Sequence, residues 1–221
     1  MPYKMLPKRK IQSVFEMLSH SWPDAECELF YKTPFQLLLA VVLSAQATDK
    51  SVNKVMKPFL ESCPDFSPRD LVNMGEKGFF NLIKTIGLAP TKSKNCFLLS
   101  KALIEKYDSK VPRQREGLEA LSGVGRKTAS VVLNVLYGEA TVAVDTHVAR
   151  LSNRLGLLKK ETDNRDMIEK ELHRVIPKKF IARAHHLLIF HGRYHCVARK
   201  PKCTSCFLKS VCPKNLVETY K

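Results

Sequence analysis

The chain has 221 residues, 44% of them hydrophobic, and carries a formal net charge of +16. This composition excludes a disordered chain and allows one large or two small domains with a real core. The charge predicts a polyanionic partner, because neutralised phosphates release condensed counterions, although a basic protein that is merely soluble is the alternative.

The first half of the chain has helical patterns throughout. Pro34 opens a run that is apolar nearly all round, typical of a helix buried in a core. Residues 49–60 are amphipathic. Ser67 is followed by Pro68 and by Asp70, which predicts a helix with a serine N-cap, proline at its first position and an acid in its first turn.

The second half continues in the same way, and the predicted fold class is all-α. Thr91 is expected to cap a helix that starts at Lys92, and Gly138 and Gly156 are expected to end helices. Two amphipathic helices and one short extended run complete the prediction, over residues 163–176, 180–191 and 141–144.

Residues 118–129 read LEALSGVGRKTA. Gly123 and Gly125 allow a tight turn between a short helix that ends at Leu121 and a new helix that starts near Arg126. Such a turn leaves backbone N–H groups at a helix N-terminus, where a phosphate oxygen can bind. The pattern alone also fits an ordinary turn between two helices.

Lys127 and Asp145 each have two interpretations. Most lysines are solvated or contact a phosphate, but a lysine can also attack carbon as the neutral amine, a form that desolvation, a nearby cation such as Arg126 and a helix N-terminus favour. Asp145 follows the apolar run Thr-Val-Ala-Val and precedes a predicted helix. It is expected to be an N-cap, a carboxylate aimed into a cleft, or both.

The cysteines near the C-terminus have the spacing C-x6-C-x2-C-x5-C. Thiolates at this density can bind one metal centre, and cysteines inside a cell remain reduced. Zinc and an iron–sulfur cluster both fit four thiolates. The cluster ligands would be Cys196, Cys203, Cys206 and Cys212, whereas the single cysteines are expected to be packing residues: Cys27, Cys63 and Cys96.

Five segments together resemble the endonuclease III family, the bifunctional DNA glycosylase/AP lyases of the helix-hairpin-helix superfamily. They are residues 37–54, 84–88, 118–134, 141–154 and 191–212, and the resemblance runs from about residue 11 to the end. It implies two helical domains flanking a DNA-binding cleft. One would be a six-helix domain over 27–139 that ends in the hairpin; the other would join 1–26 to 140–221 and hold one [4Fe–4S] cluster.

The resemblance also implies roles for residues. Lys127 would be the nucleophile and Asp145 its carboxylate partner. Gln46 would fill the gap left by a flipped nucleotide and Leu88 would be the wedge, although a solvated glutamine and a core leucine are the alternatives. The implied DNA contacts come from the hairpin and from the basic part of the cysteine loop: Gly123, Gly125, Arg126, Arg199, Lys200 and Lys202.

The implied activity is removal of oxidised or ring-damaged pyrimidines in base excision repair, followed by β-elimination 3′ to the abasic site through a lysine Schiff base. The partner would be double-stranded DNA with such lesions or abasic sites, bound by a monomer. No signal peptide is recognised, and the longest apolar run, residues 37–43, is too short to span a bilayer. We therefore expect an intracellular protein, cytoplasmic or nucleoid-associated, with no membrane partner.

One departure and two alternatives accompany this prediction. The family usually has tyrosine, asparagine and a small residue after Gly87-Leu88, whereas this chain has Ala89-Pro90-Thr91 before Lys92. Either the lesion preference or the way the opposite strand is held is therefore expected to differ. A monofunctional, adenine-removing relative would not use Lys127, and a non-enzymatic DNA-binding module would need neither Lys127 nor Asp145.

Overall fold

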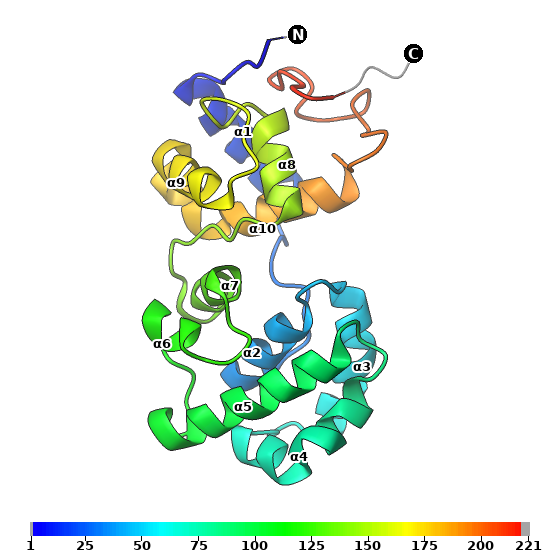
Figure 1. Cartoon of the computed structure of the whole chain (residues 1–221). Helices are drawn as coiled ribbons and strands as arrows, with labels where there is room; N and C mark the ends of the chain where they lie inside the picture. Colours follow the sequence, from blue (N-terminus) through cyan, green and yellow to red (C-terminus); the bar gives the residue numbers. More distant parts are fainter. Residues whose placement is uncertain (1, 218–221) are drawn as a thin grey trace. The chain divides into compact units, whose positions relative to one another are not determined.

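The computed structural model describes residues 2–217 and contains only helices and loops in that range, so the predicted all-α class is confirmed (Figure 1). The helices are α1 Lys8–Ser21, α2 Pro34–Leu43, α3 Asp49–Ser62, α4 Pro68–Ile83, α5 Ala89–Tyr107, α6 Arg115–Glu119, α7 Arg126–Tyr137, α8 Thr146–Arg154, α9 Arg165–Val175 and α10 Lys178–Tyr194.

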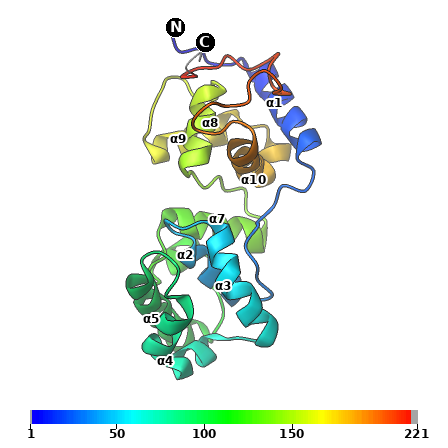
Figure 2. The ribbon, with the colours of Figure 1, turned by 90° about the vertical axis from the view of Figure 1, so that its right-hand side faces the viewer.

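The helices form two compact units (Figures 1 and 2). The middle unit, Glu28–Gly138, contains α2 to α7. The terminal unit joins the residues up to Cys27 to those from Glu139 on, and contains α1, α8, α9 and α10. The terminal unit is thus assembled from the two ends of the chain.

Helix α2 is the core of the middle unit. Every residue from Phe35 to Leu43 is buried, and the helix packs against α3, α5 and α7. Its N-cap is Thr33, whose side chain accepts a hydrogen bond from the Gln36 N–H, and Pro34 occupies the first position as predicted. A helix that is apolar on all sides is stable only where other helices surround it.

The terminal unit is built around α10, which packs against α1 and α8, while α8 also contacts α9. Helix α1 turns one apolar face inward: Ile11, Val14, Phe15 and Leu18 are buried. The ring of Phe15 stacks on Phe180 of α10, with the ring centroids 6.0 Å apart. This packing fixes the N-terminal helix on the C-terminal half.

The helix starts test the capping predictions. The predicted N-cap at Ser67 is confirmed, with a full capping box in which Asp70 bonds back to the Ser67 backbone. The prediction for Thr91 is wrong: α5 already starts at Ala89, with Leu88 in a left-handed conformation at its N-cap. A local sequence pattern does not reveal such a backbone conformation. Cys63 also differs from prediction, because it is exposed.

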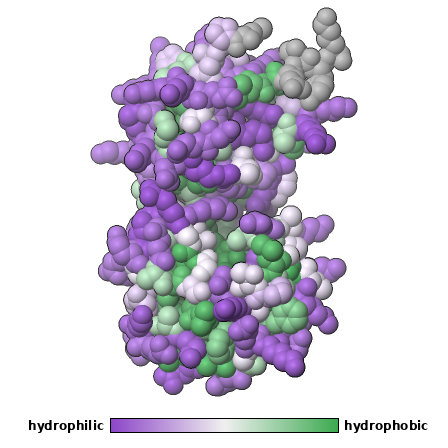
Figure 3. All heavy atoms as spheres, viewed as in Figure 1, coloured by the Kyte–Doolittle hydropathy of each residue, from purple (hydrophilic) through white to green (hydrophobic). Residues whose placement is uncertain are grey.

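The surface is largely polar. On the face shown in Figure 3, hydrophilic residues cover most of the terminal unit, and apolar residues reach the surface in the middle unit. Exposed apolar side chains of the middle unit include Met74, Leu88 and Leu98. Across residues 2–217, no helix combines the length and the apolar character needed to cross a membrane.

Gly138 and Gly156 allow a matched test of backbone strain. Both end helices as predicted, and both have a φ of +65°, but only Gly156 is crowded. A Cβ there would collide with the Lys4 carbonyl oxygen, next to the hydrogen bond of 2.8 Å from the Leu6 N–H to the Gly156 carbonyl. Gly138 has open space around it.

We expect Gly138→Ala to lower the free energy of unfolding by about 1–2 kcal/mol through backbone strain alone. Gly156→Ala should lower it by about 3 kcal/mol or more, because the clash adds to the strain. Urea denaturation followed by circular dichroism would measure both. Equal losses in the two variants would contradict the crowding of the N-terminal segment on Gly156.

Candidate functional site

The predicted hairpin lies between α6 and α7 (Figure 1). Helix α7 begins at Arg126, as predicted, whereas α6 ends at Glu119, two residues before the expected end. The turn is closed by a hydrogen bond of 3.1 Å from the Val124 N–H to the Leu121 carbonyl. Gly125 is the N-cap of α7 and supplies no side chain to bond the first N–H groups of the helix.

The two glycines of the hairpin differ in whether the fold itself requires a glycine. Gly123 has a φ of +78°, and a Cβ there would lie 2.8 Å from the Cβ of Asn95. Its neighbour Ser122 donates a hydrogen bond to the Asn95 side chain over 3.0 Å. Gly125 has an ordinary φ of −92°, and nothing lies within 4 Å of a Cβ placed on it. The fold therefore requires Gly123 but leaves Gly125 facing open space.

The first turn of α7 is open to solvent on one side only. Arg126 and Lys127 are exposed, whereas residues 128–134 are buried, and α7 packs against α2 and α6. An anchored helix thus presents two cationic side chains beside the uncapped N–H groups. Positive side chains and a helix N-terminus attract the same ligand, an anion.

Asp145 is the N-cap of α8, in the terminal unit. One carboxylate oxygen, Oδ1, accepts hydrogen bonds from the backbone N–H groups of His147 and Val148, each over 2.8 Å. The predicted N-cap is confirmed. The residue is half-buried, so its carboxylate is fixed by the helix without being sealed from solvent.

Gln46 and Leu88 lie on two loops that touch within the middle unit. A Cβ on Gly87 would be 3.8 Å from the Gln46 carbonyl oxygen. Both side chains are exposed, Leu88 by 54%, and both residues have a left-handed backbone with φ of +53° and +62°. The core position considered as the alternative for Leu88 is therefore wrong. These loops turn two side chains outward at neighbouring points.

The four clustered cysteines border one pocket of the terminal unit. Its empty space is about 370 Å³, including the part that opens to solvent, and its other walls include Arg154, His191 and His195. Two N–H groups point at sulfur: the Arg154 guanidinium lies 3.5 Å from the Cys196 Sγ, and the Lys214 amide donates to the Cys212 Sγ over 3.3 Å. Such donors suit thiolates that ligate a metal centre.

Burial raises the pKa of the Cys206 thiol, and it raises the pKa of the Cys212 thiol to about 11. Binding of a metal centre would therefore release protons from these thiols. Within residues 2–217, no group of three or more His, Cys, Asp or Glu side chains is arranged to hold a single ion.

The basic part of the loop is only partly available for a ligand. Arg199 and Lys200 are exposed. The Lys202 ammonium instead donates to the Tyr194 carbonyl over 3.2 Å, and its backbone N–H donates to the His195 carbonyl over 3.2 Å. Lys202 therefore also closes the loop on the end of α10.

Comparison with known proteins identifies the family. Residues 39–178 match the HhH-GPD superfamily base excision DNA repair protein family. Endonuclease III of Rickettsia conorii is 47% identical over 202 residues, which cover 91% of this chain and 94% of that protein. Endonuclease III of Escherichia coli is 42% identical, over 93% of this chain and 95% of that protein. The chain belongs to the endonuclease III family.

Solved structures of the endonuclease III family have the same fold. A non-covalent Endonuclease III–DNA complex matches with a TM-score of 0.88 at 44% identity, over 95% of this chain and 97% of that chain. A trapped Endonuclease III–DNA covalent intermediate matches with a TM-score of 0.87, also at 44% identity and with the same coverage. As a member of this family, the protein is a base-excision-repair DNA glycosylase and AP lyase.

Sequence reasoning missed the side chains that hold these elements in place. Arg154 donates to the carbonyls of Val197 and Ala198 over 2.7 and 2.8 Å. His185 contacts the carbonyl of Ala143 over 2.8 Å. Each contact joins residues more than forty positions apart, so no local motif signals it.

The hairpin glycines yield a prediction that separates folding from ligand binding. Gly123→Ala should lower the free energy of unfolding by about 1–3 kcal/mol, because the Cβ meets Asn95 and the backbone is left-handed. Gly125→Ala should keep the stability within about 0.5 kcal/mol. It should nevertheless weaken binding of an undamaged duplex roughly tenfold, because a methyl group blocks approach to the N–H groups.

Urea denaturation and fluorescence anisotropy at one fixed salt concentration would measure these two properties. Unchanged DNA affinity in Gly125→Ala would show that the open face of the hairpin does not contact the duplex.

Proposed function

We propose that this enzyme removes oxidised or ring-damaged pyrimidines from double-stranded DNA and then cuts the strand 3′ to the abasic site. Lys127 would be the nucleophile and Asp145 its carboxylate partner. The observation that carries the proposal is Lys127 itself, an exposed amine on the first turn of α7 beside the open side of Gly125. A similar solved structure is a trapped covalent Endonuclease III–DNA intermediate, and such an intermediate requires a nucleophile.

The chemistry of Lys127 is nucleophilic displacement at a sugar carbon. The target nucleotide leaves the base stack, because its C1′ cannot be reached inside a duplex. The neutral amine attacks C1′, the C1′–N bond to the base breaks, and the base leaves with a proton. The nitrogen lone pair then expels O4′, which takes up a proton as the C1′–O4′ bond breaks and the sugar ring opens to a Schiff base. The Schiff base acidifies the 2′ proton, and loss of that proton breaks the bond to the 3′ phosphate by β-elimination. Water then hydrolyses the imine and returns the free lysine.

Asp145 would act by charge and by proton transfer. The sugar gains positive charge as the base departs, and a fixed carboxylate stabilises that charge without having to reorganise. Its Oδ1 is held by two N–H groups of α8, which keeps the carboxylate in one orientation. A carboxylate is also suited to pass protons to and from the amine or the departing groups.

Gln46 and Leu88 would distort the duplex. An apolar wedge between base steps offsets the unstacking energy of a few kcal/mol, and a polar side chain can enter the gap that the flipped nucleotide leaves. Both side chains are exposed and lie on touching loops. The proline that follows, Pro90, occupies the first turn of α5 and rigidifies the backbone next to the wedge.

Phosphate contacts would come from two surfaces, one in each unit. The N–H groups at the start of α7 and the Arg126 side chain form the first. Arg199 and Lys200 of the cysteine loop form the second, with Lys202 contributing mainly by holding that loop. We propose that the protein binds DNA as a monomer, and that the net charge of +16 supplies the non-specific part of its affinity.

We propose that the pocket bordered by the four cysteines holds one [4Fe–4S] cluster. The donor set is four thiols that border one pocket, with N–H groups directed at two of the sulfurs. A zinc ion needs four sulfurs about 2.3 Å from one point, and residues 2–217 contain no group of side chains gathered around a single ion in this way. The cluster would stabilise the loop and would take no part in base removal.

The main prediction concerns covalent trapping. Borohydride reduces a Schiff base to a stable adduct, so wild-type enzyme should be trapped on duplexes with thymine glycol and on duplexes with an abasic site. Lys127→Ala should give no adduct with either duplex but should keep most of its affinity for DNA, because one phosphate contact at most is lost. Gel electrophoresis and anisotropy would measure the two effects.

Lys77→Ala is the matched control, since Lys77 is an exposed lysine on α4 of the same unit. It should be trapped like the wild type. An undiminished adduct in Lys127→Ala would refute the nucleophile. An adduct with the abasic duplex alone would refute the proposed lesion class and keep the lyase chemistry.

The cluster proposal predicts a yellow-brown protein with broad visible absorption when it is purified without oxygen. Cys206→Ser should lose most of this absorption together with bound iron, because one of four ligands is removed. Cys63→Ser should keep both, since Cys63 is an exposed cysteine of the other unit. A colourless protein that contains one zinc per chain would overturn the cluster.

A further inference from the structure

The segment that leads to Asp145 belongs to no helix and no β-sheet. Residues 141–144 are all buried and lie in no strand. Their backbone therefore lacks the ladder of hydrogen bonds that a sheet would supply. Because a buried carbonyl without a donor is costly, side chains of the surrounding helices must complete the pairing.

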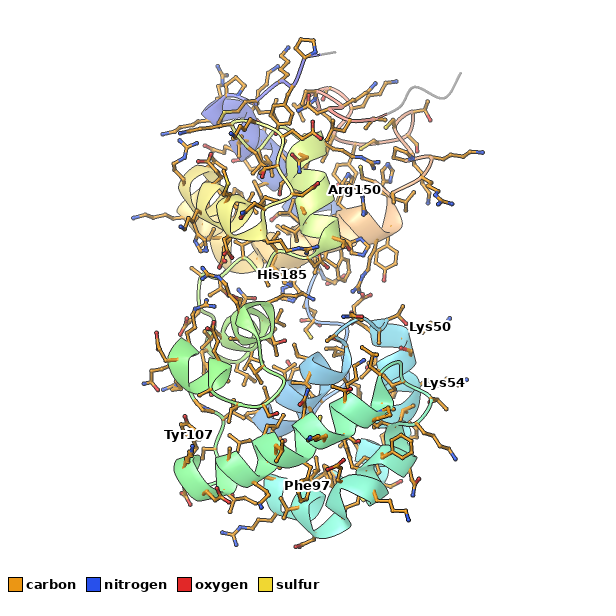
Figure 4. All side chains as sticks on the ribbon, viewed as in Figure 1. Lys50, Lys54, Phe97, Tyr107, Arg150 and His185 are labelled. Carbon is orange, nitrogen blue, oxygen red and sulfur yellow. The ribbon has the colours of Figure 1, made fainter. Side chains whose placement is uncertain are left out.

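His185 supplies one of these donors. It lies on α10, is only 3% exposed, and its Nδ1 is 2.8 Å from the Ala143 carbonyl oxygen. Since a carbonyl oxygen only accepts, Nδ1 carries the hydrogen and the tautomer is fixed. Figure 4 labels His185 on α10 of the terminal unit.

Arg165, at the start of α9, supplies the second hydrogen-bond donor to this segment. Its Nη1 donates to the Val144 carbonyl over 3.0 Å. Unlike His185, Arg165 is exposed, so water can replace it. The two carbonyls immediately before Asp145 are thus bonded by side chains from α10 and α9, respectively.

Asp145 is therefore fixed from two directions. On its N-terminal side, the backbone is held through Ala143 and Val144. On its C-terminal side, the carboxylate is bonded to N–H groups of α8. A carboxylate that must meet a developing charge gains from such preorganisation, and a displacement of about 1 Å can lower a rate roughly 100-fold.

We propose that His185 is a positioning residue for base removal, acting through the Ala143 carbonyl to set the position of Asp145. The inference rests on the proposed role of Asp145. His185 would not touch the substrate. Its loss should slow the chemical step while leaving DNA binding intact, whereas a purely structural histidine would change stability alone.

The test compares two replacements at position 185. His185→Leu fills the core but removes the donor, whereas the amide of His185→Asn places an N–H near the former Nδ1. Single-turnover excision of thymine glycol at saturating enzyme should slow roughly 10- to 100-fold in His185→Leu. His185→Asn should recover most of that loss, although it is the smaller side chain and leaves the larger cavity.

Affinity for an uncleaved duplex and thermal unfolding should be measured on the same samples. The Kd of His185→Leu should stay within about twofold of the wild type, because the bond from His185 to the Ala143 carbonyl lies inside the terminal unit. Arg165→Met should slow excision less than His185→Leu, since Arg165 is exposed and water can take its place. His173→Asn, an exposed histidine on α9, is the control and should behave as wild type.

A double-mutant cycle with Asp145→Asn identifies the route of the effect. If His185 acts through Asp145, adding His185→Leu to Asp145→Asn should slow excision by less than about threefold. Full additivity would overturn the proposal. So would equal rates in His185→Leu and the wild type, or equal losses in His185→Leu and His185→Asn.

The cycle also separates this inference from the proposed function. If Asp145→Asn alone excises the base at the wild-type rate, the proposed role of Asp145 is wrong and the positioning role falls with it. If Asp145→Asn is slow but His185→Leu is not, only the positioning role is wrong.

Discussion

The architecture of the terminal unit depends on the hydrogen bonds that the Arg154 guanidinium donates to the cysteine loop. The residue is only 7% exposed and ends α8. Its two terminal nitrogens donate to the successive carbonyls of Val197 and Ala198, while its own carbonyl accepts from the Asn215 N–H over 3.1 Å. The start of the cysteine loop and the segment that follows it therefore close on one residue. The rigid fork of arginine fits paired carbonyls in a way that lysine cannot.

Burying this charge is favourable only because both terminal nitrogens are hydrogen-bonded. A buried cation without partners would be strongly destabilising, and so would the orphaned carbonyls if arginine were removed. Helix α8 has nine residues, about 14 Å at the usual rise, with Asp145 capping its start and Arg154 at its end. One short rigid element thus fixes both the carboxylate and the cysteine loop.

Local chemistry explains which parts of the fold the sequence predicts well. The capping box of Ser67 and Asp70, the glycine ends at Gly138 and Gly156 and the hairpin start at Arg126 all depend on neighbours within a few residues. Those predictions are confirmed. The start of α5 is different, because the left-handed backbone of Leu88 at the N-cap has no local sequence signal, and the prediction of a cap at Thr91 is wrong.

The residues of the candidate site also differ in whether their signals are local in the sequence. Lys127 and Asp145 lie in short motifs of consecutive residues, so the sequence alone could single them out. Their catalytic roles remain predictions. Arg154 and His185 act through partners more than forty residues away. An arginine at the end of a helix or a histidine in an amphipathic helix has no distinctive pattern, and only the packed structure reveals its partner.

Leu88 is a position at which another residue would make the fold more stable. Serine, threonine, aspartate or asparagine at an N-cap would be about 1 kcal/mol better than an apolar residue, and α5 has no side-chain cap at all. The left-handed backbone adds about 1–2 kcal/mol of strain, because leucine lacks the freedom of glycine. Burial does not offset either term, since the side chain is 54% exposed.

Backbone strain that packing does not offset is expected where a side chain must point toward solvent before its binding partner arrives. As the proposed wedge, a leucine fixed in this way would lose little conformational freedom on entering a base stack, so more of the apolar contact energy would remain for opening the duplex. Gln46, exposed and left-handed on the adjoining loop, is preorganised in the same manner. The two loops lie close together, since a Cβ placed on Gly87 would be 3.8 Å from the Gln46 carbonyl oxygen, so the two outward side chains are presented at neighbouring points.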